Sequence, residues 1–416
     1  MTNILNSYAA VVGQDVIDKL RRLAEPLRGT RVVHVNSTRV GGGVAEILYK
    51  LVPLLNELGL QTEWEIVEGN TEFYACTKSF HNGLQGDSVS LTDGLLRNYE
   101  NVNVQNAERL RPKLQHADFV FIHDPQPAPL LRSMPDRKGK WIWRCHIDVS
   151  KPYRPVWKYL RPFVASYDAS IFSLSDFAQP LPHPQYLVPP SIDPLSEKNT
   201  DLDATEVQAV VDRFGLDTSR PLVLQVSRFD RFKDPVGVIR AFQIARRGIP
   251  GLQLVLAGGS ADDDPEGAAV LDEVRSAAGN DSAIHVLLLP PDAHRIINAL
   301  QRASDIVMQK STREGFGLTV TEAMWKSRPV IGGNTGGIRL QVIDHHTGFL
   351  VSSPEGAALR IRYLLTNREN LMKMGATAHA FARDNFLLTR HIAEYLTLML
   401  LQHNGGNRVE LQRSIA

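Results

Sequence analysis

The stretch RVVHVNSTRVGGGVAEIL, from Arg31 to Leu48, contains the unit from which the fold is built. A short β-branched run at 31–37 is followed by three consecutive glycines, and a helical pattern begins directly after them. Within 44–60 the apolar positions have helical spacing: Val44, Ile47, Leu48, Leu51, Leu54, Leu55 and Leu58. Pro53 is expected to kink or shorten this helix. The stretch therefore predicts one strand–turn–helix unit of an α/β sheet.

The same pattern recurs through the first half of the chain. Four further strands are expected at EWEIVE (63–68), DFVFIHD (118–124), WIWRCHID (141–148) and ASIFSLS (169–175). Almost continuous apolar strands that alternate with helices indicate a buried parallel sheet covered by helices on both faces.

A polar stretch with three prolines, 188–206, is expected to be a linker, after which the pattern restarts. Strands are expected at 221–228, 252–259, 283–289, 305–311, 328–333 and 347–353, and 354–403 reads as helical. The restart predicts two doubly wound Rossmann-like domains, at 1–195 and 205–390. A C-terminal helix at about 391–416 is expected to complete the first domain.

Bulk composition fits this division. A chain of 416 residues exceeds the size at which one hydrophobic core usually keeps growing. The net charge of +1 gives no global field for nucleic acid or an anionic membrane, and no apolar stretch approaches the roughly 20 residues of a membrane span. The two cysteines, Cys76 and Cys145, lack metal-ligand spacing, and one disulfide between them stays open. We expect a soluble cytoplasmic protein with no membrane or nucleic-acid partner.

In open α/β sheets ligands bind beyond the carboxyl ends of the strands, so the loops at these ends are the candidate sites. Two such domains would place their loops around a shared cleft. The glycines at 41–43 allow a backbone to approach an anion at a helix N-terminus, but they match neither GxGxxG nor the Walker pattern. A permissive tight turn explains them about as well.

Two strand ends in the first half carry polar groups. Asp124, in HDPQPAP, is either poised at its strand end or caps the next helix. His146, in WRCHID, is a candidate functional residue, although a lone histidine is more often structural. Arg144 and Asp148 are interpreted as its local partners.

The second half offers a basic cluster after its first strand, with Arg228, Arg231 and Lys233 in QVSRFDRFKD. A guanidinium fork and an ammonium suit the oxygens of a diphosphate, whereas the alternative is a solvated basic loop. The acidic run ADDDPEG at 261–267 is interpreted as a surface turn rather than a metal site.

The segment STREGFGLTVTEAMWKSRPV, from Ser311 to Val330, carries two glutamates with seven residues between them. Glu314 lies in a glycine-rich loop, and a helix is expected to begin near Leu318 or Thr319 with its free N–H groups available to a phosphate. The spacing of Thr319 and Glu322 matches a capping box, which gives Glu322 a structural explanation. A second glycine loop, GGNTGGIRL (332–340), precedes another short helix.

Together these residues resemble the retaining glycosyltransferases of GT-B fold, family 4, and within them the trehalose-forming enzymes. The phrases that carry the likeness are HVNSTRVGGGVAEIL, TKSFHNGLQG, HDPQPA, WRCHID, PPSIDPLSEKN, QVSRFD, DDPEG and REGFGLTVTEAMWK, and the likeness spans about residues 8–400. It implies transfer of glucose from a nucleoside-diphosphate glucose to free glucose, giving α,α-trehalose reversibly. The domain 1–195 would take the acceptor and 205–390 the donor.

The resemblance also implies residue roles. Arg228 and Lys233 would hold the diphosphate, Glu314 the transferred glucose and Glu322 the ribose. His146 would contact the donor sugar, and Asp124 and the Gly42–Gly43 loop would face sugar and diphosphate. The remaining donor-binding positions implied are Gly315, Phe316, Gly317, Leu318 and Thr319. Asp234 departs from the family pattern, because many members carry glycine after the lysine.

The resemblance implies no tightly bound cofactor and no required metal, with Mg²⁺ at most stimulating, and a homodimer is expected. The donor base (ADP, UDP or GDP) and the direction of the reaction stay open. Three alternatives also stay open: a retaining trehalose phosphorylase that uses inorganic phosphate, a nucleotide-sugar epimerase, and a non-catalytic sugar-binding protein.

Overall fold

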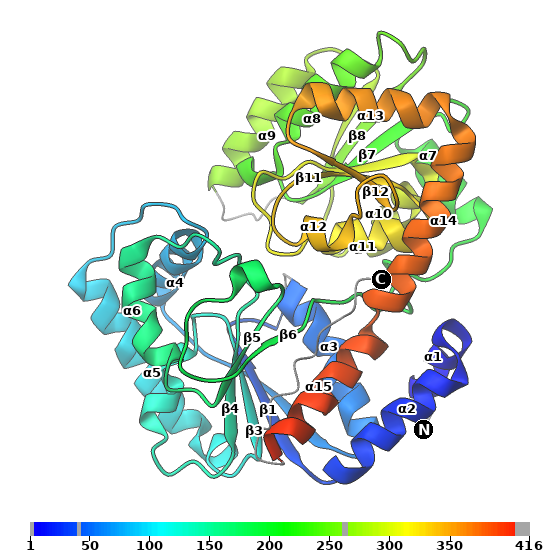
Figure 1. Cartoon of the computed structure of the whole chain (residues 1–416). Helices are drawn as coiled ribbons and strands as arrows, with labels where there is room; N and C mark the ends of the chain where they lie inside the picture. Colours follow the sequence, from blue (N-terminus) through cyan, green and yellow to red (C-terminus); the bar gives the residue numbers. More distant parts are fainter. Residues whose placement is uncertain (1–3, 40–42, 260–264, 404–416) are drawn as a thin grey trace. The chain divides into compact units, whose positions relative to one another are not determined.

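A computed structural model describes residues 4–39, 43–259 and 265–403 of the chain. Its contacts divide the chain into two compact units. Unit 1 combines Met1–Pro190 with Leu388–Ala416, and unit 2 is Ser191–Leu387. Figure 1 shows both units and labels their elements.

Unit 1 is built on a six-stranded parallel sheet of order β2-β1-β3-β4-β5-β6. The strands are β1 (Arg31–Asn36), β2 (Gln61–Ile66), β3 (Phe119–His123), β4 (Lys140–Arg144), β5 (Ala169–Phe172) and β6 (Gln185–Leu187). The first five correspond to the expected strands, although β2 begins and ends two residues before the expected 63–68. The sixth was not predicted, because three residues with only Tyr186 buried give no readable period. The strand order reverses between β1 and β3, and this reversal is the topological switch point of the sheet.

Helices cover both faces of the unit 1 sheet. They are α1 (Ile4–Val12), α2 (Gln14–Ala24), α3 (Gly43–Glu57), α4 (Thr71–Leu84), α5 (Asp93–Leu114), α6 (Arg154–Val164) and α15 (Leu388–His403), with the 3-10 turns η1 (Glu25–Leu27), η2 (Ala128–Ser133) and η3 (Ser175–Phe177). One core joins α4, α5 and α6 to the sheet, and α15 packs beside α2 and α3 (Figure 1). Helix α3 continues through Pro53, so the expected shortening is wrong.

Unit 2 has a second six-stranded parallel sheet, of order β12-β11-β10-β7-β8-β9. Its strands are β7 (Leu222–Val226), β8 (Gln253–Gly258), β9 (Ile284–Leu288), β10 (Ile306–Gln309), β11 (Val330–Gly333) and β12 (Gly348–Val351). All six lie within their predicted ranges. Here the switch point falls between β7 and β10.

Alternate residues along the unit 2 strands enter two different cores. The helices are α7 (Ala204–Arg213), α8 (Pro235–Ala245), α9 (Pro265–Ala278), α10 (His294–Ala303), α11 (Leu318–Trp325), α12 (Ile338–Gln341), α13 (Pro354–Thr366) and α14 (Arg368–Asn385), with the 3-10 turn η4 (Arg231–Lys233). Val223 packs with α8, α9 and α13, whereas Leu224 packs with α7, α10 and α11. The prediction of a doubly wound sheet is therefore confirmed for both units.

The expected linker at 188–206 is wrong for most of its length. The boundary falls after Pro190, and the following segment belongs to unit 2. Asn199 is 1% exposed there, and its side chain and carbonyl accept hydrogen bonds from Lys326 Nζ (3.0 Å) and Trp325 Nε1 (3.1 Å). Polar groups rather than apolar ones fix this segment, so hydropathy does not reveal it. The return to unit 1 occurs at Leu388 rather than near 391.

Two smaller expectations also have structural outcomes. Cys76 and Cys145 are both buried and unpaired, so the open disulfide alternative is wrong. Across the described ranges, no helix combines the length and apolar character needed to cross a membrane.

Candidate active site

The predicted site residues of unit 2 lie at the switch point of its sheet. Arg228 and Lys233 follow β7, and Glu314 follows β10, the strand paired beside it. Because parallel strands end at the same edge, the two loops meet, and Thr312 N donates to Phe232 O over 2.8 Å. This is the position at which doubly wound folds bind ligands.

Lys233 and Glu314 form the centre of this arrangement. Lys233 Nζ donates to Glu314 Oε2 over 2.6 Å, and both side chains are largely buried. The same oxygen accepts hydrogen bonds from Gln309 Nε2 (3.2 Å) and Ser311 Oγ (3.1 Å). Three donors therefore converge on one oxygen of the Glu314 carboxyl group. This is a fixed polar site rather than a mobile loop charge.

The basic cluster predicted after β7 separates into groups with different partners. Arg228 keeps 68% of its side chain exposed, with Asp230 Oδ2 at 3.5 Å. Arg231 pairs with Glu273 of α9 at 3.3 Å, on another part of the unit. Arg228 is thus the cation of this loop that is most available to a ligand from solution.

The structure explains how aspartate can occupy position 234, where many family members carry glycine. Its φ is 48°, in the left-handed region where glycine is favoured and aspartate is tolerated. Its Oδ1 accepts the Gly237 N–H at 3.1 Å and caps α8, while its carboxylate pairs with the buried Lys310. The residue therefore keeps the turn that glycine would allow and adds an ion pair behind Lys233.

The glycine loop predicted to face a phosphate is closely packed from behind. Gly317 has a φ of 84° and precedes the first residue of α11, Leu318. A Cβ at Gly336 would lie 1.7 Å from Glu314 O, and one at Gly337 would lie 2.5 Å from Phe316 Cα. The loop after β11 therefore supports the Glu314 loop backbone to backbone, which only glycine permits.

The remaining residues of this loop divide by exposure. Phe316 is buried and packs edge-on against Phe386, with ring centroids 5.6 Å apart. Gly315, Gly317, Leu318 and Thr319 are partly exposed. No side chain caps α11, and although Val320 N–H donates to Gly317 O, the start of this helix can still receive an anion, as at other helix N-termini.

The capping-box prediction for Glu322 is wrong. Because α11 begins at Leu318, Glu322 is its fifth residue and lies beyond the N3 position. Glu322 is 2% exposed, and its Oε1 lies 3.9 Å from Lys198 Nζ. The structure thus brings Glu322 to Lys198 and not to Glu314, so the two glutamates are in separate environments.

Lys326 lies one helical turn beyond Glu322 and is 6% exposed. Its Nζ donates to Asn199 Oδ1 (3.0 Å) and to Glu322 O (3.1 Å). Burial lowers the pKa of Lys326 to about 7, against the opposing effect of Glu322. A buried lysine amino group, which changes charge near neutral pH, therefore lies against the main-chain carbonyl of Glu322.

In unit 1 the corresponding loops follow β1 and β3. Gly42 lies outside the described residues, and Gly43 is the first residue of α3. Asp124 has a φ of 63°, and its Oδ1 accepts the His146 main-chain N–H at 2.7 Å. It does not cap the following turn, whose N-cap is Pro127. Burial raises the pKa of Asp124 to about 7, opposed by the His146 hydrogen bond and by Arg144.

His146 is half-buried, and its Nε2 lies 2.9 Å from His123 Nδ1. Burial and then Arg144 hold the pKa of His146 well below its usual range. The expected local pairing fails: Asp148 accepts from Ser150, and the fully buried Arg144 guanidinium has no hydrogen-bond partner among the described residues. Asp124 and His146 are thus in direct contact at adjacent strand ends.

Several site residues were missed at the sequence level. Gln309 and Ser311 flank Lys310 at the end of an apolar strand, and this polar run was the available signal. Lys198 lies in the segment dismissed as a linker. His34 and His123 are single polar residues inside apolar strands, a pattern that sequence reasoning did not weigh.

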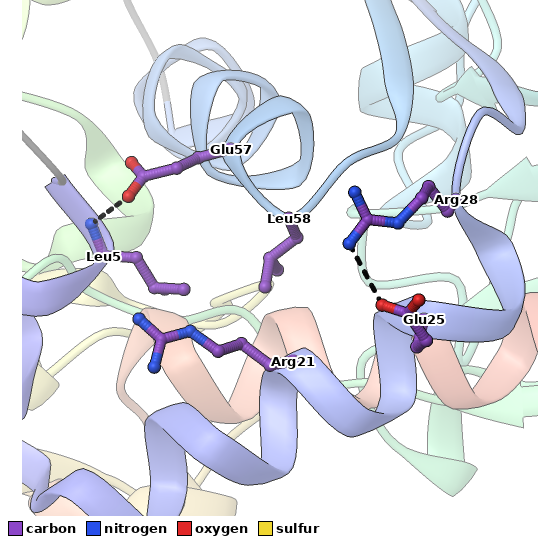
Figure 2. Close-up of a pocket in the computed structure, with 6 residues that line it drawn as sticks. All are labelled: Leu5, Arg21, Glu25, Arg28, Glu57 and Leu58. Carbon is purple, nitrogen blue, oxygen red and sulfur yellow. Dashed lines mark hydrogen bonds and ion pairs between the residues drawn. The ribbon is translucent and has the colours of Figure 1, made fainter. Parts of the chain in front are cut away.

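The hollow in Figure 2 is not this site. It lies among α1, α2, η1 and α3, and its volume is about 230 Å³. Glu57 accepts the Leu5 N–H, Arg28 pairs with Glu25, and Arg21 bonds Asp18 and Asn6, so the charged groups that line it already have hydrogen-bond or ion-pair partners.

No group of three or more potential metal ligands occurs in the described part of the chain. The acidic run at 261–267 lies mostly outside the described residues.

Comparison with known proteins agrees with this architecture. Residues 34–179 match the family model "Trehalose synthase, N-terminal domain", and 208–381 match "Glycosyl transferases group 1". An E. coli structure described as "Trehalose-6-phosphate from E. coli bound with UDP-2-fluoro glucose" aligns with a TM-score of 0.73 at 14% identity, over 88% of this chain and 98% of that one. Fold and family models together define a glycosyltransferase of the GT-B class.

Relatives of similar sequence identify the family within this class. The trehalose synthase of Pyrococcus horikoshii is 46% identical over 95% of both chains. The trehalose phosphorylase of Pleurotus pulmonarius is 27% identical over 96% of this chain and 61% of its own length. The chain belongs to the trehalose synthase family.

Proposed function

We propose that the protein transfers glucose from a nucleoside-diphosphate glucose to free glucose, with retention of configuration, and forms α,α-trehalose reversibly. The observation that carries this proposal is the Lys233–Glu314 pair at the β7/β10 switch point, with Arg228 exposed beside it. Membership of the trehalose synthase family supports the choice of acceptor and product.

The charges match the chemistry of this reaction. Breaking the anomeric C–O bond places negative charge on the departing diphosphate and positive charge on the sugar ring. Arg228, Lys233 and the free N–H groups of α11 would stabilise the diphosphate where its charge develops. Glu314 would accept hydrogen bonds from hydroxyls of the transferred glucose. We assign the acceptor proton to the leaving phosphate, in a same-face displacement.

The other predicted residues take supporting roles in the proposal. Glu322 would bind the ribose, after Lys198 gives way to the ligand. His146 would contact the donor sugar, and Asp124 with the Gly42–Gly43 loop would face sugar and diphosphate. Neither a bound metal nor a tightly bound cofactor is needed for these steps, and a Mg²⁺ effect would act through the diphosphate. A homodimer and a cytoplasmic location complete the proposal.

The test measures trehalose formation from glucose with ADP-, UDP- and GDP-glucose in parallel, and trehalose cleavage with each nucleoside diphosphate or with inorganic phosphate. We expect synthesis with at least one donor, an α,α product by NMR, and cleavage only with a nucleoside diphosphate. Cleavage that depends on phosphate would establish the phosphorylase instead. Conversion of the donor without glucose would establish the epimerase.

A further inference from the structure

A chain of three histidines runs through the buried face of the unit 1 sheet and ends at His146. His34 Nδ1 lies 3.0 Å from His123 Nε2, and His123 Nδ1 lies 2.9 Å from His146 Nε2. The rings are stacked, with centroids 5.3 and 5.2 Å apart. His34 and His123 come from the adjacent strands β1 and β3, so the sheet itself sets the spacing.

The three imidazoles are held neutral. Burial lowers the pKa of His34 to about 3, and burial with the neighbouring charges holds the pKa of His123 well below its usual range. The titratable or charged groups that face the chain are Arg144 of β4, Asp124 after β3, and His391 and Tyr395 of α15. Arg144 is a buried cation, so it opposes a second positive charge at His123 or His146.

Neutral rings make the two hydrogen bonds interdependent. A neutral imidazole carries one N–H, so each His–His contact needs one donor and one acceptor nitrogen. Only two arrangements satisfy both contacts: every proton on Nδ1, or every proton on Nε2. Any mixture sets two lone pairs or two N–H groups against each other. The tautomer of His146 is therefore decided together with those of His123 and His34.

His34, at the buried end of the three-histidine chain, favours the arrangement with every proton on Nδ1. His34 Nε2 is buried with no hydrogen-bond partner among the described residues, and its ring stacks on Phe121 at 4.8 Å. With every proton on Nε2, this atom would be a buried N–H without an acceptor, which folded proteins tolerate less readily than an unpaired acceptor.

We propose that the His34–His123–His146 chain fixes His146 as the neutral tautomer with its proton on Nδ1, so that this nitrogen donates a hydrogen bond to an oxygen of the transferred glucose. His146 Nδ1 is the chain's outer nitrogen and has no partner among the described residues. The sugar contact rests on the proposed function, whereas the tautomer does not. His123 and His34 are positioning residues that act through His146.

The arrangement also assigns His146 a limited chemical role. With its proton on Nδ1, His146 offers the substrate no lone pair, because its Nε2 already accepts the His123 N–H and His123 Nδ1 cannot take a second proton. The chain therefore orients a donor and does not relay protons. This agrees with a reaction in which the leaving phosphate receives the acceptor proton.

The direct test is ¹⁵N NMR of the full chain labelled at histidine, with His34→Phe, His123→Phe and His146→Gln used to assign the rings. We expect all three rings to be protonated on Nδ1 alone and unchanged from pH 6 to 8. A proton on His146 Nε2, or a His146 ring that titrates in this range, would overturn the proposal. This spectrum is read without any substrate, so it stands apart from the proposed reaction.

Kinetics provide the second readout. His123→Phe should lower kcat/KM for the donor by about tenfold, the loss of one orienting hydrogen bond, and should add a second His146 tautomer to the ¹⁵N spectrum. The pH profile of this variant should stay as in wild type, because burial and Arg144 still hold the pKa of His146 low. His123→Gln, whose amide can donate to His146 Nε2, should restore kcat/KM and the single tautomer. Phe121→Leu, which disturbs packing on His34 without removing a nitrogen, should leave both unchanged. A wild-type kcat/KM with a single tautomer in His123→Phe, or a second His146 tautomer in Phe121→Leu, would refute the assignment.

Discussion

Replacing Gly336 with alanine tests whether the close approach of this glycine to the Glu314 main chain positions Glu314 for activity. A control glycine measures the backbone strain alone. The new Cβ would lie 1.7 Å from Glu314 O, whereas real Cβ contacts essentially never fall below 3.0 Å. The two backbones must therefore move apart by at least 1.3 Å, the difference between these distances. A misplacement of about 1 Å can cost about 10²-fold in rate, so kcat/KM should fall by about that factor.

The stability change divides into two contributions. Gly336 has a φ of 44°, and a non-glycine residue in the left-handed region costs roughly 1–2 kcal/mol. Overpacking adds about 1–3 kcal/mol. Gly279→Ala is the matched control, because its φ is 58° and nothing lies within 4 Å of the added Cβ. The control should lose only about 1–2 kcal/mol and keep full activity.

Both variants would be assayed by initial rates of trehalose formation and by urea unfolding. The reasoning fails if Gly336→Ala keeps kcat/KM within about threefold of wild type. It also fails if the two variants lose the same stability, because the close approach to Glu314 would then have no energetic effect.

Three further changes test other parts of the site. Arg228→Ala should lower kcat by about 10²-fold with little loss of stability, since the side chain is 68% exposed; unchanged turnover would remove Arg228 from the charge-stabilising set. Glu322→Gln should raise the donor KM more than it lowers kcat, and a variant with unaltered donor affinity would contradict the ribose role. Lys326→Met tests how the pKa of this lysine affects the pH dependence of stability. Burial lowers the folded pKa of Lys326 to about 7, so above that pH the folded protein binds fewer protons than the unfolded chain. Lys326 therefore makes the free energy of unfolding rise with pH, up to its unfolded pKa near 10.5. Urea unfolding at pH 7.5 and 9.5 should show this rise in wild type and a smaller one in Lys326→Met; equal slopes would show that Lys326 is not strained by burial.

The sequence was most informative where burial is apolar and continuous. Eleven of the twelve strands were located from their apolar runs, most of which are buried on both faces, although β2 and β9 are only partly buried; the three-residue β6 was missed. The candidate loops could be placed for the same reason, since strand ends define the switch points. Side-chain partners were harder, because Arg231 and Lys233 are two residues apart yet pair with Glu273 and Glu314 respectively.

Local rules failed where tertiary contacts override them. Thr319 and Glu322 have capping-box spacing, but the N-cap of α11 is the left-handed Gly317, two residues before Thr319, so Glu322 lies beyond the N3 position. The supposed linker is polar, yet Asn199 is buried because Lys326 and Trp325 bond to it. The helix start is decided by the backbone angle of Gly317, and the burial of Asn199 by partners that are distant in sequence. Neither can be read from a local sequence pattern.

The return of the chain to unit 1 has a consequence for its synthesis. Unit 2 occupies the 197 residues from Ser191 to Leu387, so α15 leaves the ribosome only after all of them. At 5–20 residues per second the rest of unit 1 must wait roughly 10–40 s for its last helix. The face of the unit 1 sheet that α15 later covers carries His34, His123 and Arg144. Water can solvate these side chains until α15 packs on them. These polar groups, interleaved with Phe121, reduce the apolar surface that unit 1 exposes before α15 covers it.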